Sequence, residues 1–184
     1  YYGKEEIVYI PNTFKEYTIT IIGNSAFYNC NNLSELQLPE NITTIGESAF
    51  EGCRSLFSIT IPSKVQVIGS YAFANCTCEI LWDNPTIKNL QCGVFTYYEG
   101  ETLTIPNSIA EIEDGAFEVC NNLLDIYYDG TNTEWNNISI GFLNNDSLFN
   151  ANIHFQEKIE IEVFEENGKK YLYLGKYPQT VVSD

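Results

Sequence analysis

The stretch Ile45-Gly46-Glu47-Ser48-Ala49-Phe50-Glu51-Gly52-Cys53 decides the fold, because the same pattern of residues recurs along the chain. Residues 22–30 and 68–76 are close copies, and weaker copies end at residues 95 and 120. The anchoring phenylalanines are Phe27, Phe50, Phe73, Phe95 and Phe117, so the steps between them are 23, 23, 22 and 22 residues. A fixed repeat of about 20–50 residues is the sequence signature of a solenoid, in which each unit buries its apolar face only by stacking on its neighbours.

Each repeat also contains one strand. In residues 33–39 the apolar positions are Leu33, Leu36 and Leu38, followed by Pro39. The alternation at the end of this segment predicts a β-strand, and the proline ends it because proline cannot donate to a ladder. The Gly-x-x-Ala-Phe segment that follows predicts a short helical turn that buries the phenylalanine.

Cysteines occupy one fixed position, three residues after the anchoring phenylalanine, at Cys30, Cys53, Cys76 and Cys120. One cysteine per repeat indicates reduced packing residues, because a free cysteine behaves as a small buried hydrophobe. Cys92 instead falls at a turn position that should be exposed, and it is the candidate for a reactive thiol.

The third repeat is irregular. Counting back from Phe95 places Cys78, Leu81 and Asp83 in the three apolar positions of its strand. An aspartate in a core position predicts a local distortion there.

The two ends depart from the repeat, as exposed terminal faces require. Residues 7–11 and 17–21 predict a hairpin that caps the N-terminal end. After a last repeat strand at residues 123–128, Thr133 before Glu134-Trp135 predicts a capped helical turn. We assign residues 1–155 to a repeat array with caps. Residues 156–184, with the turn Asn167-Gly168, are assigned to a β-hairpin that is either an extension or the start of a following domain.

The full motif, Ile-Gly-x-x-Ala-Phe-x-x-Cys-x-x-Leu-x-x-Leu-x-Leu-Pro, resembles the BspA-like, or Treponema pallidum type, leucine-rich repeats. Residues 135–141 and 150–155 are similar to the cap that closes such arrays, and residues 172–180 are similar to the start of an uncharacterised domain of Firmicutes surface proteins. The resemblance implies a leucine-rich-repeat solenoid with short parallel strands on its concave face and turns and short helical segments opposite. It also implies a surface-attached or secreted bacterial protein, often adhesive toward host proteins or other bacteria, with no catalytic residues.

Charge and composition exclude several function classes. The net charge is −16, from 25 acidic and 9 basic residues, and the basic residues are not clustered. Nucleic acid and anionic membranes are therefore excluded as partners, and no apolar run approaches the length of a membrane span, about 20 residues. The single histidine, His154, has no motif that pairs it with a cysteine or carboxylate, and Cys76-Thr77-Cys78 lacks zinc-site spacing. We therefore expect no enzyme activity, no metal and no cofactor.

The remaining candidate site is the concave surface of the strands, where alternate residues point outward. One predicted outward row is Glu35, Ser58, Ile80, Thr102 and Asp125, and the other is Gln37, Thr60, Trp82, Thr104 and Tyr127. Trp82 is the strongest candidate because tryptophan is enriched at interface hot spots. The alternative is that Trp82 turns inward to fill the irregular repeat.

These observations predict an extracellular, protein-binding, adhesin-like module of a bacterial surface protein. Its partner would be an unknown protein, either of the host matrix or of another bacterial surface. The alternative is a structural spacer that projects an adjacent domain. The chain begins at Tyr1 without a signal sequence, which we interpret as part of a longer protein. On the binding hypothesis, Trp82→Ala weakens binding without lowering the melting temperature.

Overall fold

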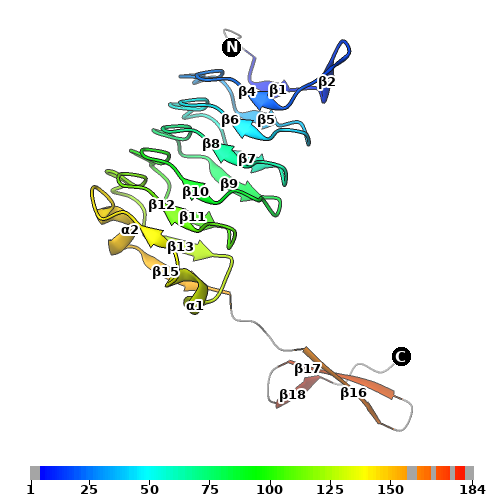
Figure 1. The fold of residues 1–184 in the computed structure, drawn as a ribbon. Helices are drawn as coiled ribbons and strands as arrows, with labels where there is room; N and C mark the ends of the chain where they lie inside the picture. The colour runs from blue at the N-terminus through cyan, green and yellow to red at the C-terminus, as the bar shows by residue number, and fades with distance from the viewer. Residues whose placement is uncertain (1–4, 157–160, 167–168, 175–176, 181–184) are drawn as a thin grey trace.

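The protein folds as a β-solenoid of stacked turns (Figure 1). The structure is a computed structural model that describes residues 5–156, 161–166, 169–174 and 177–180, the last three ranges as backbone only. Seven strands face one side, which we call the concave face. They are β1 (Ile7–Tyr9), β5 (Glu35–Gln37), β7 (Ser58–Ile61), β9 (Glu79–Trp82), β11 (Thr102–Ile105), β13 (Asp125–Tyr128) and β15 (Asn152–Phe155).

A second set of two-residue strands follows the first, one per turn. These are β4 (Ile21–Ile22), β6 (Thr44–Ile45), β8 (Val67–Ile68), β10 (Asn89–Leu90), β12 (Glu111–Ile112) and β14 (Ser139–Ile140). All strand pairs of successive turns are parallel. The groups are β1-β5, β7-β9 and β11-β13-β15 on the concave side, and β4-β6-β8 and β10-β12-β14 in the second set. The parallel strands predicted from the sequence are confirmed.

The Gly-x-x-Ala-Phe segment forms a tight turn and not the predicted helical turn. Two residues of each such turn, four positions apart, have positive φ, for example 52° at Ser48 and 74° at Gly52. No right-handed helix contains such residues. The turn is held instead by its neighbour in the stack, because the amide of Phe27 donates to the carbonyl of Ala49 at 2.8 Å, and that of Phe50 donates to Ala72 at 2.9 Å.

The phenylalanines of these turns form a continuous column through the core. Ring centroids are 5.4 Å apart from Phe27 to Phe50 and again to Phe73, 6.2 Å from there to Phe95, and 5.3 Å to Phe117. All are buried. The first three pairs are stacked and the last is tilted by 45°. Aromatic pairs at these spacings contribute beyond the area they bury, so the column links each turn to the next.

The cysteine position completes the same core. Each thiol donates to the carbonyl of the phenylalanine one turn earlier, at 3.0 Å from Cys53 to Phe27, 3.0 Å from Cys76 to Phe50 and 2.9 Å from Cys120 to Phe95. Burial raises the pKa of Cys53 to about 12 and that of Cys120 to about 12. The predicted packing role of these three is confirmed, whereas Cys30, in the first turn, is only half-buried.

The N-terminal end differs from the prediction. Residues 7–11 do not pair with residues 17–21, because β1 pairs in parallel with β5, and β4 pairs with β6. The hairpin is shorter, formed by β2 (Thr13–Phe14) and β3 (Tyr17–Thr18), and it extends outward from the end of the array (Figure 1). Phe14 and Tyr17 are consequently exposed.

The C-terminal end is closed by two short helices, α1 (Asn132–Trp135) and α2 (Asp146–Asn150). The N-cap of α1 is Thr131, which forms a capping box with Glu134. The prediction of Thr133 as the cap is therefore wrong, because the helix begins earlier. Beyond the array, β16 (Ile161–Glu166) pairs antiparallel with β17 (Lys169–Leu174), as predicted, and β17 pairs with an additional strand, β18 (Tyr177–Thr180). The predicted turn Asn167-Gly168 lies outside the described residues.

Asn145, just before α2, replaces the turn that would come next. Its side-chain oxygen accepts the amide of Phe117 at 3.0 Å, and its Nδ2 donates to the carbonyls of Glu113 at 2.9 Å and Gly141 at 2.8 Å. In the interior turns the corresponding acceptor is a backbone carbonyl, as where Phe95 donates to Ala116. The fully buried Asn145 side chain therefore replaces the backbone acceptor that a further repeat would provide.

We expect Asn145→Ala to lower the free energy of unfolding of the C-terminal turns by about 2–3 kcal/mol, because it removes the acceptor of the buried Phe117 amide and the side-chain donor to the carbonyls of Glu113 and Gly141. Hydrogen exchange at the Phe117 amide should accelerate by about an order of magnitude or more. Asn137→Ala, at an exposed position of the same cap, is the control. Equal exchange rates in the two variants would show that Asn145 does not cap the array.

Candidate functional site

The concave face presents two rows of outward side chains, set by the strand register. The first row is Ile7, Glu35, Ser58, Glu79, Thr102, Asp125 and Asn152. The second row is Tyr9, Gln37, Thr60, Leu81, Thr104, Tyr127 and His154. Every predicted row member is found here except Ile80 and Trp82, and the rows extend one strand further in each direction than the sequence analysis placed them.

The register predicted for the irregular repeat is wrong by one residue. β9 pairs with β7 so that Ile59 faces Ile80 and Ile61 faces Trp82. Paired residues of β7 and β9 are 21 positions apart, whereas Phe73 and Phe95 are 22 positions apart. Counting back from Phe95 therefore displaced the predicted strand by one residue. A slip of one residue exchanges the two faces of a strand. Ile80 is therefore buried, and Leu81 points outward with 42% of its surface exposed.

Trp82 packs inward, the second of the two alternatives. It lies partly buried against the core, and its indole Nε1 donates to the carbonyl of Thr104 at 2.8 Å. β9 and β11 belong to separate ladders, so this bond links the two strands where the sheet is interrupted. Asp83, which follows Trp82, is exposed and occupies no core position.

Tyr98 makes the second link across this interruption. It stands where other turns have cysteine, and its hydroxyl donates to the carbonyl of Cys78 at 2.8 Å, across the gap between β9 and β11. Burial raises the pKa of Tyr98. A side chain at Gly100 would place its Cβ 2.5 Å from Cε1 of the Tyr98 ring, so only glycine fits beside it.

At the C-terminal end of the concave face, three outward side chains form a cluster. Nε2 of His154 lies 2.7 Å from Oδ1 of Asp125, and Nδ2 of Asn152 donates to the same oxygen at 3.1 Å. These contacts hold the pKa of the Asp125 carboxyl below its usual range, His154 contributing most. The His154 ring stacks on Tyr127 with centroids 4.7 Å apart and 17° between the planes.

Two hollows open on this face. The larger, about 510 Å³, lies towards the N-terminal end and is lined by side chains that include Glu35, Glu40, Lys64 and Asp83. The smaller, about 320 Å³, is lined by Thr104, Tyr127, Tyr128, Asp129, His154, Phe155 and Gln156. Acidic groups border both hollows.

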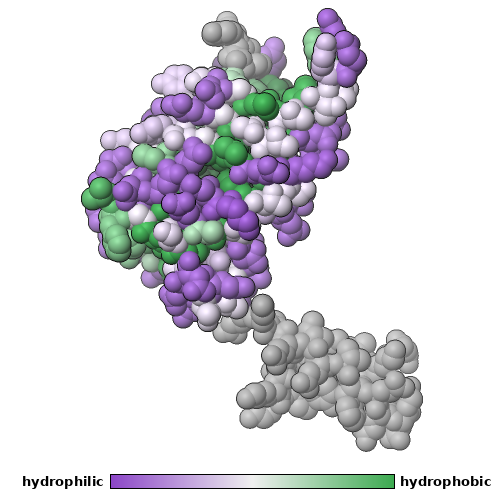
Figure 2. All heavy atoms as spheres, viewed as in Figure 1, coloured by the Kyte–Doolittle hydropathy of each residue, from purple (hydrophilic) through white to green (hydrophobic). Residues whose placement is uncertain are grey.

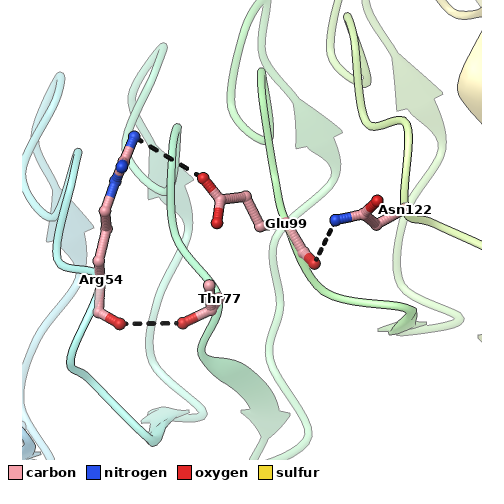
Figure 3. Close-up of polar contacts among 4 residues, drawn as sticks. All are labelled: Arg54, Thr77, Glu99 and Asn122. Atoms are coloured by element: carbon pink, nitrogen blue, oxygen red, sulfur yellow. Dashed lines mark hydrogen bonds and ion pairs between the residues drawn. The ribbon is translucent and has the colours of Figure 1, made fainter.

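The basic side chains near this face are already engaged. Nη2 of Arg54 lies 3.7 Å from Oε1 of Glu99, an ion pair that spans Thr77 of the intervening turn (Figure 3). In the same edge, Thr77 donates to the carbonyl of Arg54, and Asn122 donates to that of Glu99. Nζ of Lys64 donates to Asn41 at 2.7 Å. The concave face is therefore acidic overall.

Comparison with known proteins identifies the repeats. Residues 58–170 match the model of the BspA type leucine-rich repeat region, in six copies. The chain belongs to this family. The predicted resemblance, and the solenoid fold that it implied, are confirmed.

Solved structures of other leucine-rich repeat proteins are similar. The T. pallidum leucine-rich repeat protein is 23% identical with a TM-score of 0.59, over 77% of this chain and 75% of that one, a likeness of fold. A leucine-rich cell surface protein of Faecalibacterium prausnitzii is 30% identical (TM-score 0.48) over 74% of this chain, which spans 37% of that protein's length. A Bacteroides ovatus leucine-rich repeat protein is 20% identical (TM-score 0.29), over 81% and 63% of the two chains. No curated protein matches.

His154 is a further residue of this BspA-type array that the sequence analysis misjudged. It was assigned no carboxylate partner, yet it contacts Asp125 directly. The signal was present, because Asn152 to Phe155 alternates in the same way as Asp125 to Tyr128. Extending the rows into the cap strand would have placed His154 next to Tyr127.

The described residues contain no candidate metal site and no membrane-spanning helix. Among residues 5–156 and the described strands that follow, no group of three or more His, Cys, Asp and Glu side chains is placed to hold a metal ion. In the same residues no helix is long and apolar enough to cross a bilayer.

Apolar side chains also gather away from the concave face. Figure 2 shows a mostly hydrophilic surface with an apolar patch at the edge of the C-terminal cap. Phe142 and Leu143 of this cap are 85% and 67% exposed, and Phe142 stacks on Phe149.

We expect the side chains of Trp82 and Tyr98, which bridge β9 and β11, to stabilise this part of the array. Trp82→Ala should lower stability by about 2–4 kcal/mol, which reverses the expectation from sequence. Tyr98→Phe should cost about 1–2 kcal/mol because it leaves a buried carbonyl unpaired. The neighbouring Tyr97→Phe, at a side chain 51% exposed, should change stability by less than about 0.5 kcal/mol. Urea unfolding measures all three, and a stable Trp82→Ala would contradict the packing role.

Cys92 is the one exposed cysteine among the six, as predicted. In the native protein at about pH 8, we expect a maleimide to label Cys92 rapidly and to spare Cys53 and Cys120. Those thiols are buried, with pKa values of about 12, so they are almost entirely protonated at that pH. Mass spectrometry of tryptic peptides checks the order of labelling. Rapid labelling of Cys53 in the native state would contradict it.

Proposed function

We propose that this chain is an extracellular protein-binding module of a bacterial surface protein and that it binds through its concave face. The location at the cell surface is part of the proposal and is supported by membership of the BspA-type family. The alternative of a structural spacer has the same fold, and the two differ in what the concave face presents.

One observation carries the proposal. The second outward row is not uniformly polar, since Leu81 and Tyr127 are 42% and 47% exposed, with His154 beside them. Thr104 lies between Leu81 and Tyr127, so these side chains form a continuous strip on one face of the sheet. We call Leu81, Thr104, Tyr127 and His154 the concave strip.

The strip has the composition of a contact surface. Tyrosine is enriched at binding hot spots, and a central apolar side chain with a polar surround excludes water from the contact. Aspartates and threonines surround the strip and nothing in the described chain covers it. A spacer has no need of exposed leucine and tyrosine in this position.

The proposal is tested with defined partners. The purified chain is immobilised and presented with collagen, fibronectin, fibrinogen, laminin and bacterial surface proteins, and dissociation constants are measured by biolayer interferometry. We expect at least one specific partner, and we expect Leu81→Ser and Tyr127→Ala each to weaken its binding by about tenfold or more.

Leu143→Ser is the matched control, because it removes an exposed leucine from the cap and not from the concave face. Its binding should be unchanged. Binding that Leu143→Ser weakens as much as Leu81→Ser would point to non-specific apolar adhesion. A chain that binds none of the panel at micromolar concentration would favour the spacer.

A further inference from the structure

The hollow beside Tyr127 has a shape and chemistry more specific than the rest of the concave strip. Its volume is about 320 Å³, and Thr104, Tyr127, Asp129, His154 and Gln156 contribute polar or aromatic groups to its lining. Along the second row the order is Thr104, Tyr127, His154. Because one face of the Tyr127 ring stacks on His154, its other face is turned towards the small side chain of Thr104 and is open to a ligand.

Two carboxylates lie near the Tyr127 ring, and one of them, Asp129, lines the hollow. Asp125 and Asp129 lie two residues before and two residues after Tyr127. Oδ1 of Asp125 accepts from His154 and Asn152, and Oδ1 of Asp129 accepts from Gln156 at 2.9 Å. Within the described part of the chain, the second oxygen of each carboxylate accepts no hydrogen bond. An aromatic face in a hollow lined by one carboxylate, with a second carboxylate nearby, is suited to a cationic group.

No basic side chain of the described residues fills this role. Lys15 lies over Phe14 in the N-terminal hairpin, and Lys88 lies next to β10. Arg54 is paired with Glu99 and Lys64 is bonded to Asn41. A basic side chain of a partner protein would supply the cation that complements the hollow.

His154 adds a charge that depends on pH. When neutral, it leaves the negative charges of Asp125 and Asp129 to attract a cation, and when protonated it cancels one of them. The other titratable groups close to His154 are on or just after β13, namely Asp125, Tyr127 and Asp129. The outward residues of β11, Thr102 and Thr104, are uncharged.

We propose that the hollow beside Tyr127 binds a lysine or arginine side chain of the protein partner, and that protonation of His154 releases it. This inference rests on the proposed function, since it assigns part of the partner's chemistry to the same concave face. It makes binding strongest near neutral pH and weaker in acid. A neutral sugar could also stack on Tyr127, but it would not require the two carboxylates, and it serves as an outcome of the test.

His154 is the only histidine of the chain, so its imidazole is a unique reporter by nuclear magnetic resonance. The Cε1–H signal is followed during titration with a glycine-rich hexapeptide that contains two lysines. The matched control peptide contains norleucine at both positions, which preserves the aliphatic stem and removes the charge. At about pH 7.5 we expect a saturable shift with the lysine peptide and none with the norleucine peptide. A neutral maltooligosaccharide is titrated in the same way.

Variants separate a specific site from general attraction to an acidic protein. Asp129→Asn and Tyr127→Ala should each weaken lysine-peptide binding by about tenfold or more. Glu111→Gln removes the same charge from an exposed position on β12, outside the concave face, and should weaken binding by less than about twofold. Isothermal titration calorimetry measures all three.

The pH dependence tests the switch. Between about pH 7.5 and about pH 5, the wild-type protein should lose about tenfold in affinity, and His154→Gln should retain its affinity across the range. The subsite is overturned if norleucine or maltooligosaccharide binds as well as lysine, or if Glu111→Gln matches Asp129→Asn. The switch is overturned if His154→Gln keeps the wild-type pH dependence.

The subsite and the proposed function fail separately. A protein partner whose binding depends on Leu81 but not on Asp129 or pH would support the binding module and overturn the subsite. Lysine-peptide binding with no protein partner in the panel would support the subsite and contradict the module.

Discussion

The structure depends on the hydrogen bonds that each turn forms with the next. The amides of Ser25, Phe27 and Asn29 donate to the carbonyls of Glu47, Ala49 and Glu51, and later turns repeat the pattern. An isolated turn with positive φ at two of its residues would leave these amides unpaired in the core, at a cost that no single repeat can offset. Stacking satisfies them, and it fixes the repeat length at 22 or 23 residues because the donors and acceptors must coincide.

The turns of the solenoid therefore keep a fixed position relative to their neighbours, whereas the strands tolerate a change in residue spacing. The third repeat keeps its turn in step, with Phe73 donating to Val94, although its strand begins two residues early relative to its predecessor. At the break between β9 and β11, Trp82 and Tyr98 bridge the two turns with side-chain donors. The same shift directs Leu81 outward, so a packing accommodation supplied the apolar residue at one end of the concave strip.

The sequence predicts well whatever recurs and poorly whatever occurs once. The phenylalanine column, the cysteine position and the parallel strands follow from matching copies, because one physical solution repeats. The strand register at Ile80 failed because the missing residue can be placed before or after the strand, and only packing decides between them. Asn145 gave no signal, since its role depends on which backbone groups the last turn leaves unpaired. His154 was accessible in principle, because the alternation of the cap strand continues the two outward rows.

The position of the Tyr127 hollow follows from these constraints. Turn residues cannot vary freely, because each must provide donors, acceptors or ring contacts to its neighbour. Outward strand residues touch only solvent and adjacent row members, so they can change without disturbing the stack. The cap strand β15 is freer still, since it is paired on one side only among the described residues. It brings Asn152 and His154 against Asp125 and Tyr127, residues separated by 27 positions in sequence. A binding site assembled there uses the one strand whose outward residues no further repeat has to match.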